Sequence, residues 1–419
     1  MPIAAKMAQM WLTRSFKPFT FNNEYDENLP YHDLYNLGLY VHIPFCRSIC
    51  KFCPYCKVKY DKELSDKYVD ALIKEIHLAA ARDKKEATSL YFGGGTPALI
   101  SDRLPEIVET LKIYFDIKDG IGAELHPDDV NIDTLNKLRA AGVTKISIGI
   151  QSFNDKYQSI LGRKTVNIEK LQKNLSAPSP DEKFGTISFD LIFALPNQTF
   201  EDLKNDIDLA FASGANHIAI YPFIDFDFTK STIKEMSKNK KRKLLDDITA
   251  YCIERGLVRN SIWTFSKGAN INYSSMTRDN FLGFGCSATT LLKEQFKINT
   301  FSVWEYIKRV ESGKLPTSLT TRFSPRQRMI YYLFWTLYST KCNPEDFEKF
   351  FGVSLKKMYG FEFNIAKLLG YLDEEDGEYI MTPKGAFYYH YYENFYTLSY
   401  IDKMWGIMSD EAFPQKIQL

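Results

Sequence analysis

Short apolar runs alternate with longer amphipathic segments between residues 38 and 221. The apolar runs have the length and composition of β-strands and cover residues 38–43, 88–92, 122–125, 144–149, 186–193 and 216–221. Between them, apolar side chains recur at helical spacing in residues 64–76, 103–115, 131–141, 167–175 and 199–213. Such strand–helix repeats favour parallel strands joined by right-handed crossovers, with functional loops at the carboxyl ends of the strands. Because there are six units rather than eight, we expect an α/β fold with an open, partial (β/α)6 barrel of the TIM type.

The segments outside these repeats divide the rest of the chain. Residues 1–36 have no strong period and are expected to form an N-terminal extension in front of a partial barrel over residues 37–230. Residues 231–320 are expected to complete the barrel and to connect it to a last domain. From Ser324 onward the pattern changes to capped helices and then to a hairpin. Residues 321–419 are therefore expected to form a winged-helix-like α+β cap, a shape that does not by itself imply DNA binding.

The charges of the 419 residues nearly cancel, at a formal net charge of +1. This balance provides no broad field for nucleic acid or a membrane surface, and no run of about eighteen apolar residues would span a bilayer. The first residues also lack the apolar stretch of a secretion signal. Four of the seven cysteines lie close together, so we expect a cytoplasmic protein whose thiols bind metal rather than form disulfides.

Cys46, Cys50 and Cys53 follow the first apolar run at C-x3-C-x2-C spacing. Three soft thiolates on one loop suit an iron–sulfur cluster, and a fourth iron without a protein ligand would leave one position open for chemistry. Zinc is the alternative metal, because Cys56 would close a set of four ligands. Buried thiols that bind nothing are a third interpretation. The spacing alone leaves these alternatives open.

The sequence Leu-Tyr-Val-His-Ile-Pro-Phe-Cys over residues 39–46, followed by this cysteine spacing, resembles the radical S-adenosylmethionine (SAM) superfamily. Within it, the sequence resembles the oxygen-independent coproporphyrinogen III oxidase-like family, which includes oxidases, heme chaperones and radical methyltransferases. The resemblance implies that Cys46, Cys50 and Cys53 bind a 4Fe-4S cluster. It also implies catalytic roles for Tyr40, beside the SAM sulfonium, and for His42, which supports the cluster.

Further matching positions imply contacts with SAM. Phe52 matches an aromatic residue that touches a second SAM molecule. The segment Tyr91–Pro97 contains three consecutive glycines, which allow a ligand to approach the backbone closely and can offer exposed N–H groups. In the family this segment holds the amino group and the carboxylate of SAM. Gly93, Gly94, Gly95 and Thr96 are therefore expected to contact the cofactor.

Polar residues at the ends of the later strands complete the expected site. Glu124 and Gln151 end the third and fourth apolar runs, and Arg163 follows shortly afterwards; all three match family residues that contact SAM. Asp190 is a charge within a nearly continuous apolar run, where an unpaired carboxylate is costly, so it should have a ligand or a basic partner. The family aspartate at this position faces SAM. Pro222 ends the sixth run, where the family backbone contacts adenine.

Three departures from the family pattern bear on the substrate. The oxidases carry a fourth cysteine two positions after the third, whereas this chain has Tyr55 there and Cys56 one residue later. Lys164 follows Arg163, where most members have a histidine or an alanine close by. Heme chaperones carry a heme-ligating histidine before a Leu-Gly-x-Gly segment, and the corresponding position here is Ile271. The chaperone function is therefore disfavoured.

The resemblance implies a radical SAM enzyme. A reduced cluster would donate one electron to SAM, and the resulting 5′-deoxyadenosyl radical would abstract hydrogen from a small-molecule substrate, for which a tetrapyrrole such as a porphyrin is a candidate. One or two SAM molecules would bind, and an electron donor such as flavodoxin or ferredoxin would reduce the cluster. Oxidative decarboxylation and methyl transfer or cyclopropane formation remain alternatives. A non-catalytic heme-binding chaperone or a zinc-stabilised module is the alternative from another class.

Overall fold

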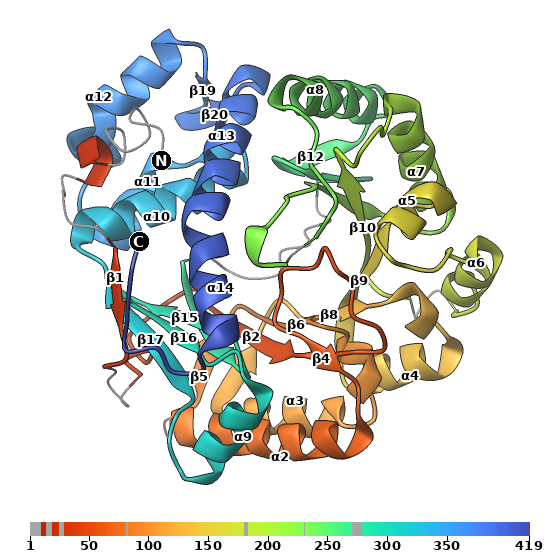
Figure 1. Ribbon diagram of the computed structural model, residues 1–419. Coiled ribbons are helices and arrows are strands. Elements are labelled where there is room, and N and C mark those ends of the chain that lie inside the picture. Colours follow the sequence, from red (N-terminus) through yellow and green to blue (C-terminus); the bar gives the residue numbers. More distant parts are fainter. Residues whose placement is uncertain are drawn as a thin grey trace.

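The computed structural model describes residues 10–13, 19–24, 29–80, 83–179, 183–229, 231–269, 271 and 279–419. These residues form one large twisted sheet with helices along its outer side, and a smaller helical unit lies beside the sheet (Figure 1). The mixed α/β architecture expected from the sequence is therefore confirmed.

Six parallel strands form the centre of the sheet. They pair in the order β2-β6-β8-β9-β10-β11, so each strand lies beside the next one along this part of the chain. Their bounds are Leu37–Ile43 (β2), Ser89–Gly94 (β6), Ile121–Leu125 (β8), Val143–Gln151 (β9), Thr186–Phe193 (β10) and His217–Pro222 (β11). Each of the six apolar runs identified in the sequence forms one of these strands. Parallel pairing places all six carboxyl ends at one edge, where the functional loops were expected.

A helix follows each of these strands and covers the outer side of the sheet (Figure 1). Most of these helices begin at a residue whose side chain accepts a hydrogen bond from the first turn, as at Asp61, Asn131 and Thr199. Their buried faces join the strands in one core. Their bounds are Lys62–Ala79 (α2), Leu104–Tyr114 (α3), Ile132–Ala140 (α4), Asp155–Ile160 (α5), Ile168–Ser176 (α6), Phe200–Ala212 (α7) and Lys238–Glu254 (α8).

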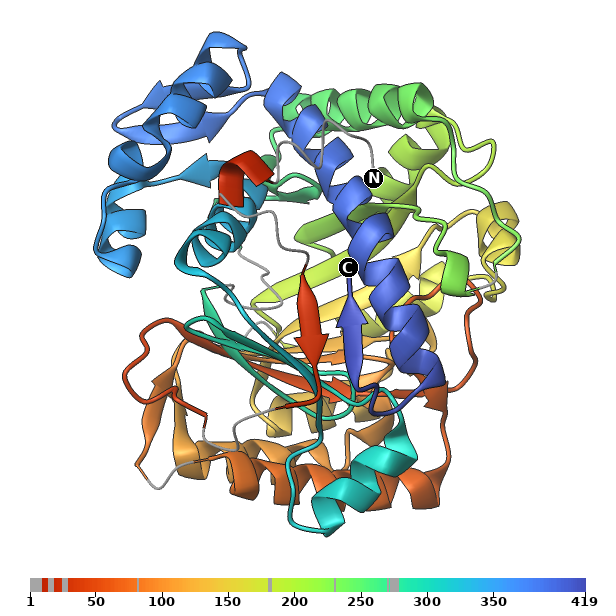
Figure 2. The ribbon, with the colours of Figure 1, turned by 60° about the vertical axis from the view of Figure 1, so that its left-hand side comes forward.

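The described sheet extends beyond the six central strands at both edges and does not close into a barrel. Beside β2 lies the parallel strand β14, and beside β11 lies the antiparallel strand β13. The added strands are β12 (Val258–Ser261), β13 (Thr264–Ser266), β14 (Asn280–Phe284), β15 (Thr289–Leu292), β16 (Gln295–Asn299), β17 (Thr317–Arg322), β1 (Thr20–Asn22) and β21 (Lys416–Gln418). Two strands from opposite ends of the sequence, β1 and β21, pair at the outer edge (Figure 2).

The helical unit beside the sheet has its own small core. Three helices, α10 (Pro325–Tyr338), α11 (Pro344–Phe351) and α12 (Leu355–Leu368), pack against a three-stranded sheet. That sheet consists of β18 (Lys341–Cys342), β20 (Glu378–Met381) and β19 (Leu372–Glu375). Helices followed by a hairpin give this unit the winged-helix-like shape expected from the sequence.

Two further helices cross in front of the large sheet. Helix α13 (Pro383–Tyr396) continues through a π-helical turn at Thr397–Ile401 into α14 (Asp402–Asp410) (Figure 2). The amino end of α14 lies beside the segment after β11, because Phe228 N–H donates to Asp402 Oδ1 at 3.3 Å. None of the described helices combines the length and the apolar character needed to cross a membrane.

A buried carboxylate ties helix α2 to the added strands. Glu75 accepts hydrogen bonds from the Tyr306 hydroxyl (2.6 Å), the Gly285 N–H (2.7 Å) and the Asn299 side chain (2.9 Å). Tyr306 lies on α9 (Val303–Glu311), Gly285 follows β14 and Asn299 ends β16. Burial raises the pKa of Glu75 to about 7. This one side chain therefore serves as the acceptor for groups from three separate elements.

Replacing Glu75 with alanine should destabilise the whole fold. Three buried donors would lose their acceptor at about 1–3 kcal/mol each, so we expect the free energy of unfolding to fall by at least about 3 kcal/mol. Chemical denaturation monitored by circular dichroism measures this change. Glu63→Ala on the same helix is the control, because Glu63 is exposed and its ion pair with Lys67 should contribute less than about 1 kcal/mol. Similar stabilities for the two variants would contradict the role assigned to Glu75.

Candidate active site

The expected cluster ligands lie on a loop that leaves the carboxyl end of β2. The loop is closed at its base by a short parallel pair, β3 (Phe45–Cys46) and β4 (Val58–Lys59). Backbone bonds from Val58 N–H to Pro44 O (2.7 Å) and from Tyr60 N–H to Cys46 O (2.8 Å) hold the two ends together. Cys46, Cys50 and Cys53 are all half-buried within it. We call residues 44–57 the cluster loop.

Two side-chain contacts that the sequence did not reveal fix the cluster loop. Arg47 donates through Nε and Nη2 to Asp129 Oδ1, at 3.0 and 2.7 Å, and so ties the loop to the segment after β8. Lys57 Nζ donates to Cys53 O at 2.5 Å and to Tyr55 O at 3.3 Å. No spacing rule links Arg47 to Asp129, because parallel strand pairing brings them together across 82 positions of sequence.

The three thiols share one electrostatic environment. Burial raises the pKa of Cys46 to about 12, and the neighbouring Cys53 and Cys50 contribute to the shift. Arg163 lies within the field of the same thiols: burial lowers its pKa, whereas Cys50, Cys53 and Cys46 oppose that effect. Within the described chain, these three sulfurs do not gather into a set within 4.8 Å of one another, as ligands of a single ion would. A multi-iron cluster binds each thiolate at a different iron, so the wider spacing suits a cluster better than zinc.

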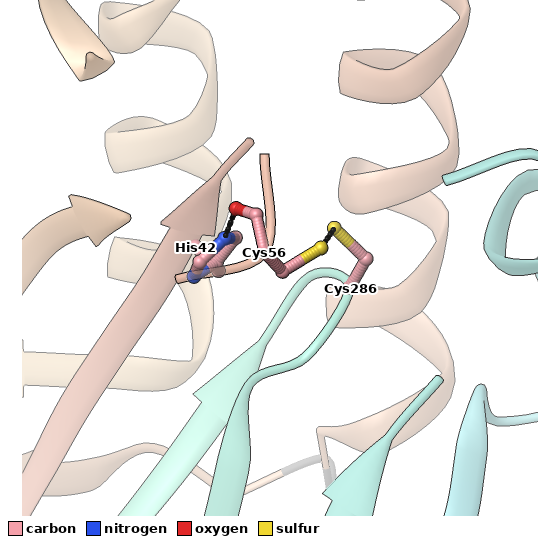
Figure 3. A group of neighbouring side chains, drawn as sticks. All are labelled: His42, Cys56 and Cys286. Atoms are coloured by element: carbon pink, nitrogen blue, oxygen red, sulfur yellow. Dashed lines mark hydrogen bonds between the residues drawn. The ribbon is translucent and has the colours of Figure 1, made fainter. Parts of the chain in front are cut away.

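Cys56 turns away from the three thiols. Its Sγ lies 3.8 Å from Sγ of Cys286 (Figure 3). The same Sγ lies 3.0 Å from the backbone O of Phe301. Its backbone O lies 2.9 Å from His42 Nε2. This orientation does not support Cys56 as the fourth ligand of a zinc ion on the cluster loop.

Tyr40 and His42 lie on one face of β2, as their spacing of two indicates. The Tyr40 hydroxyl is 3.0 Å from His42 Nδ1. Burial raises the pKa of Tyr40 well above its ordinary value, and nearby Glu124 adds to this effect. Since Nε2 of His42 contacts the Cys56 carbonyl, the histidine connects β2 to the end of the cluster loop.

The glycine segment at the end of β6 packs directly against β2 and the cluster loop. A Cβ at Gly94, where φ is +111°, would lie 2.5 Å from the His42 ring, and one at Gly95 would lie 2.6 Å from Phe45 O. The N–H groups of Gly95 and Thr96 donate to Ile43 O (2.7 Å) and Phe45 O (2.8 Å). These two N–H groups therefore have protein acceptors, in contrast to the expectation that they are exposed. The glycines are required here for close packing.

Two half-buried carboxylates lie on the central strands β8 and β10. Glu124 on β8 accepts from the Tyr91 hydroxyl (3.0 Å) and from Gly94 N–H (3.1 Å), and burial raises its pKa. A Cβ at the neighbouring Gly93 would lie 3.0 Å from Glu124 Oε1. Asp190 on β10 accepts from Ser147 Oγ at 2.8 Å. Burial and then the charge of Glu124 raise the pKa of Asp190 to about 7.

A bulge between β9 and β10 sets the position of Gln151. Asp190 pairs with Gly149 and Leu191 pairs with Gln151, which leaves one extra residue on β9. Gln151 has a φ of +70°, an uncommon value for a residue with a side chain. A Cβ at Gly149 would lie 2.9 Å from Gln151 Nε2 and 3.8 Å from Arg163 Nη1. The bulge therefore brings Gln151 and Arg163 together.

Phe52 and Pro222 lie in more apolar surroundings. Phe52 packs against a cluster formed by residues at the ends of β10 and β11 and on α5, which includes Tyr157, Ile192 and Phe223. Pro222 is buried and pairs with Phe193 in the last register position of β11. Of the expected heme-ligand segment, Ile271 is described, whereas residues 272–276 lie outside the described residues.

Helix α14 supplies aromatic residues that sequence reasoning did not assign to the site. Trp405 contacts Tyr55 of the cluster loop at a ring-centroid distance of 5.9 Å, and Phe301 at 6.0 Å.

His126 is a further residue near the site that the sequence did not identify, although it follows Glu124 by two residues. Burial and the positive charge of Arg163 lower the pKa of His126 to about 4. Its position directly after a strand that carries an expected site residue could have identified it from the sequence.

Known proteins resemble this chain in sequence and in fold. Residues 40–210 match the radical SAM superfamily. The heme chaperone HemW of Bacillus subtilis is 26% identical, over 76% of this chain and 88% of its own length. The oxygen-independent coproporphyrinogen III oxidase of Helicobacter pylori (strain 26695) is 25% identical, over 92% of this chain and 88% of its own length.

A solved structure shares the fold over nearly the whole chain. Coproporphyrinogen III oxidase (HemN) from Escherichia coli, described as a radical SAM enzyme, superposes with a TM-score of 0.75 at 20% identity. The alignment covers 91% of this chain and 97% of that structure. The chain therefore carries a radical SAM domain, a kind of domain that uses a 4Fe-4S cluster and SAM, within a fold of the coproporphyrinogen III oxidase type.

Proposed function

We propose that this protein is a radical SAM enzyme that acts on a tetrapyrrole. The observation that carries the proposal is the grouping of the three half-buried thiols with Arg163, Glu124 and Asp190 at the carboxyl ends of the parallel strands. When bound, the reduced cluster and SAM supply a 5′-deoxyadenosyl radical that takes a hydrogen atom from the substrate. The role of the protein is to hold these groups in position and to exclude water.

The charges of the site support binding of a cationic cofactor. Burial raises the pKa of both Asp190 and Glu124, and the charge of Glu124 raises that of Asp190 further, against a smaller opposing effect of Arg163. The hydroxyls of Ser147 and Tyr91 each donate one hydrogen bond to a carboxylate but contribute no positive charge. SAM carries a sulfonium and an ammonium group, so its binding would supply opposite charge to both carboxylates.

The residues of the cluster loop fit an iron–sulfur cluster. The loop presents three thiols of the kind that iron–sulfur clusters require; Arg47 anchors it to Asp129, and Lys57 braces it internally through Cys53 O. Cys46, Cys50 and Cys53 would hold the cluster. His42 would support it from β2 through its contact with the Cys56 carbonyl.

Two observations support a tetrapyrrole substrate. Tyr55 is 54% exposed on the cluster loop, and Trp405 of α14 lies against it, so an aromatic surface borders the site. Aromatic faces pack well against flat rings such as the individual pyrroles of a tetrapyrrole. The names of the relatives refer to coproporphyrinogen and to heme, which are both tetrapyrroles.

Mass spectrometry of SAM products tests the proposal directly. The anaerobic, reconstituted protein would be incubated with a reductant, SAM and either coproporphyrinogen III or heme. Formation of 5′-deoxyadenosine and methionine that depends on the tetrapyrrole supports the proposal. S-adenosylhomocysteine together with a methylated tetrapyrrole would identify the methyltransferase alternative. No SAM cleavage with either compound, in a protein that holds its cluster, would contradict the proposed substrate class.

The cysteines should separate into ligands and a non-ligand. Cys56→Ala should retain about four irons per chain after anaerobic reconstitution, because its sulfur faces Cys286 and not the other three thiols. Cys50→Ala should lose most of this iron. Iron analysis and the visible spectrum measure both outcomes. Loss of iron in Cys56→Ala, comparable to that in Cys50→Ala, would rule out the three-ligand arrangement.

Asp190→Asn should lower activity without lowering stability. SAM cleavage should fall by about one to three orders of magnitude, at about 1.4 kcal/mol per tenfold. The raised pKa of Asp190 means that the folded state holds its proton more tightly than the unfolded state, so wild-type stability decreases as the pH rises from about 4 to about 7. Asparagine removes this penalty. The melting temperature of the variant should therefore match wild type near pH 4 and exceed it at pH 8.

Asp206→Asn is the matched control for this effect. Asp206 on α7 is also buried, and it accepts from Ser152 Oγ and Phe153 N–H, both at 2.7 Å. Its burial raises its pKa as well, to about 6. Its substitution should leave SAM cleavage per folded molecule unchanged. An Asp190→Asn variant that unfolds early but cleaves SAM at the wild-type rate would show that Asp190 has a structural role only.

The heme chaperone is the second candidate, because HemW proteins are among the relatives. The chain has Ile271 where the chaperone motif has its histidine, so we expect no stable heme ligation through that segment. Hemin titration monitored by visible absorption measures binding. One-to-one binding that is lost when residues 271–276 are replaced, without SAM cleavage on any tetrapyrrole, would favour the chaperone function.

A further inference from the structure

Two thiols lie in direct contact beside the cluster loop. The Sγ atoms of Cys56 and Cys286 are 3.8 Å apart, and Figure 3 shows the two side chains pointing toward each other. Cys286 is fully buried on the turn between β14 and β15, and Cys56 is half-buried at the end of the cluster loop. The two residues are 230 positions apart in sequence, so the contact is produced by the fold and not by local spacing.

A third polar side chain, His42, lies close to the two sulfurs but is less available than they are to form a new bond. Atoms of His42, Cys56 and Cys286 lie within 4.8 Å of one another, a spacing that a soft metal ion could bridge. However, both ring nitrogens of His42 already have partners, since Nδ1 contacts the Tyr40 hydroxyl and Nε2 contacts the Cys56 carbonyl. Metal binding would break at least one of these contacts, whereas bonding between the two sulfurs would break neither.

Neighbouring backbone and side-chain groups hold the two sulfurs close to each other. Cys56 Sγ lies 3.0 Å from the carbonyl of Phe301, and the Tyr68 hydroxyl oxygen lies 3.6 Å from Cys286 Sγ. Tyr68 also accepts from Cys286 N–H at 2.9 Å and donates to His42 O at 2.8 Å. Cys286 is therefore held through its backbone N–H on a tight turn, whereas Cys56 lies at the end of a loop.

We propose that Cys56 and Cys286 form a redox modification site, where a peroxide converts the two thiols to an intramolecular disulfide. Cys56, the more accessible sulfur, attacks the peroxide O–O bond, becomes a sulfenic acid and releases water. The Cys286 sulfur then attacks the Cys56 sulfur, the S–S bond forms and a second water leaves with the oxygen. The two thiols lose two electrons in total, and the peroxide accepts them. A dithiol reductant reverses the change.

The geometry allows this bond with a small movement. The sulfurs must approach from 3.8 Å to about 2.05 Å, which rotation of the Cys56 side chain on its loop can provide. The disulfide would join the cluster loop to the β14–β15 turn. The carboxyl end of the loop would then stay in place when an oxidant removes iron from Cys46, Cys50 and Cys53. This inference concerns thiol chemistry and does not depend on the proposed substrate.

Peptide mapping of the full-length oxidised protein tests the proposal. The reduced, cluster-containing protein would be treated with hydrogen peroxide, blocked with an alkylating agent and digested with trypsin and chymotrypsin. Cleavage after Tyr55 separates Cys53 from Cys56, so each cross-link can be assigned. We expect a Cys56–Cys286 cross-linked peptide as the main disulfide product, the loss of these two free thiols, and their return after treatment with dithiothreitol.

Two variants sharpen the result. Cys286→Ala should leave Cys56 as a sulfenic acid that dimedone traps, whereas Cys252→Ala, a buried cysteine on α8, should leave the cross-link unchanged. Cross-links from Cys56 to Cys50 or Cys53 instead, or a Cys286 that stays reduced until the protein unfolds, would overturn the proposal. A zinc or copper ion that is present in purified wild-type protein and lost from Cys286→Ala would also overturn it, because the pair would then be a metal site. The peptide map of the wild-type protein tests the proposal by itself, so its result holds even if a variant folds poorly.

Discussion

Parallel pairing of the six central strands is the constraint on which the site depends. Neighbouring parallel strands share a direction, so residues that are far apart in sequence meet wherever the strands end. Cys46 follows β2, Glu124 and Gln151 lie at the ends of β8 and β9, and Asp190 lies within β10; the pairing of these strands brings the four residues to one side of the sheet. The bulge at Gln151 refines this arrangement locally. The site is thus built from strand ends, and the helices on the outer side determine mainly its stability.

Two carboxylates, Glu75 outside the site and Asp190 within it, have different surroundings. The Glu75 carboxylate accepts hydrogen bonds from three elements, so it holds helix α2 against the added strands. In the site, Asp190 has one hydroxyl donor and another carboxylate nearby. The first arrangement gives the carboxylate three donors within the protein, although burial still raises its pKa to about 7. The second gives the carboxylate fewer donors within the protein, as is common where a ligand is to bind.

Much of the fold could be predicted from the sequence, because it depends on local patterns. Every predicted central strand is present, since runs such as residues 186–193 are mostly apolar and are buried along nearly their whole length. The eight added strands escaped prediction: β1 and β21 are three residues long and come from opposite ends of the chain, so no local period identifies them. The site residues on strand ends were recognisable by motif. Contacts such as Arg47 with Asp129, Trp405 with Tyr55, and Cys56 with Cys286 were not, because they join segments that only the tertiary fold brings together.

The contact between Cys56 and Cys286 also has a consequence for the order of events during synthesis. At about 5–20 residues per second, a ribosome needs roughly 10–50 s to add the residues that separate the two cysteines. Throughout that interval the thiols of the cluster loop exist without the β14–β15 turn, and helix α14 with Trp405 emerges later still. The newly synthesised cluster loop is therefore exposed to solvent until the β14–β15 turn and helix α14 have been made. In the cell, this interval is the period in which the thiols most need protection from oxidants and from competing metal ions.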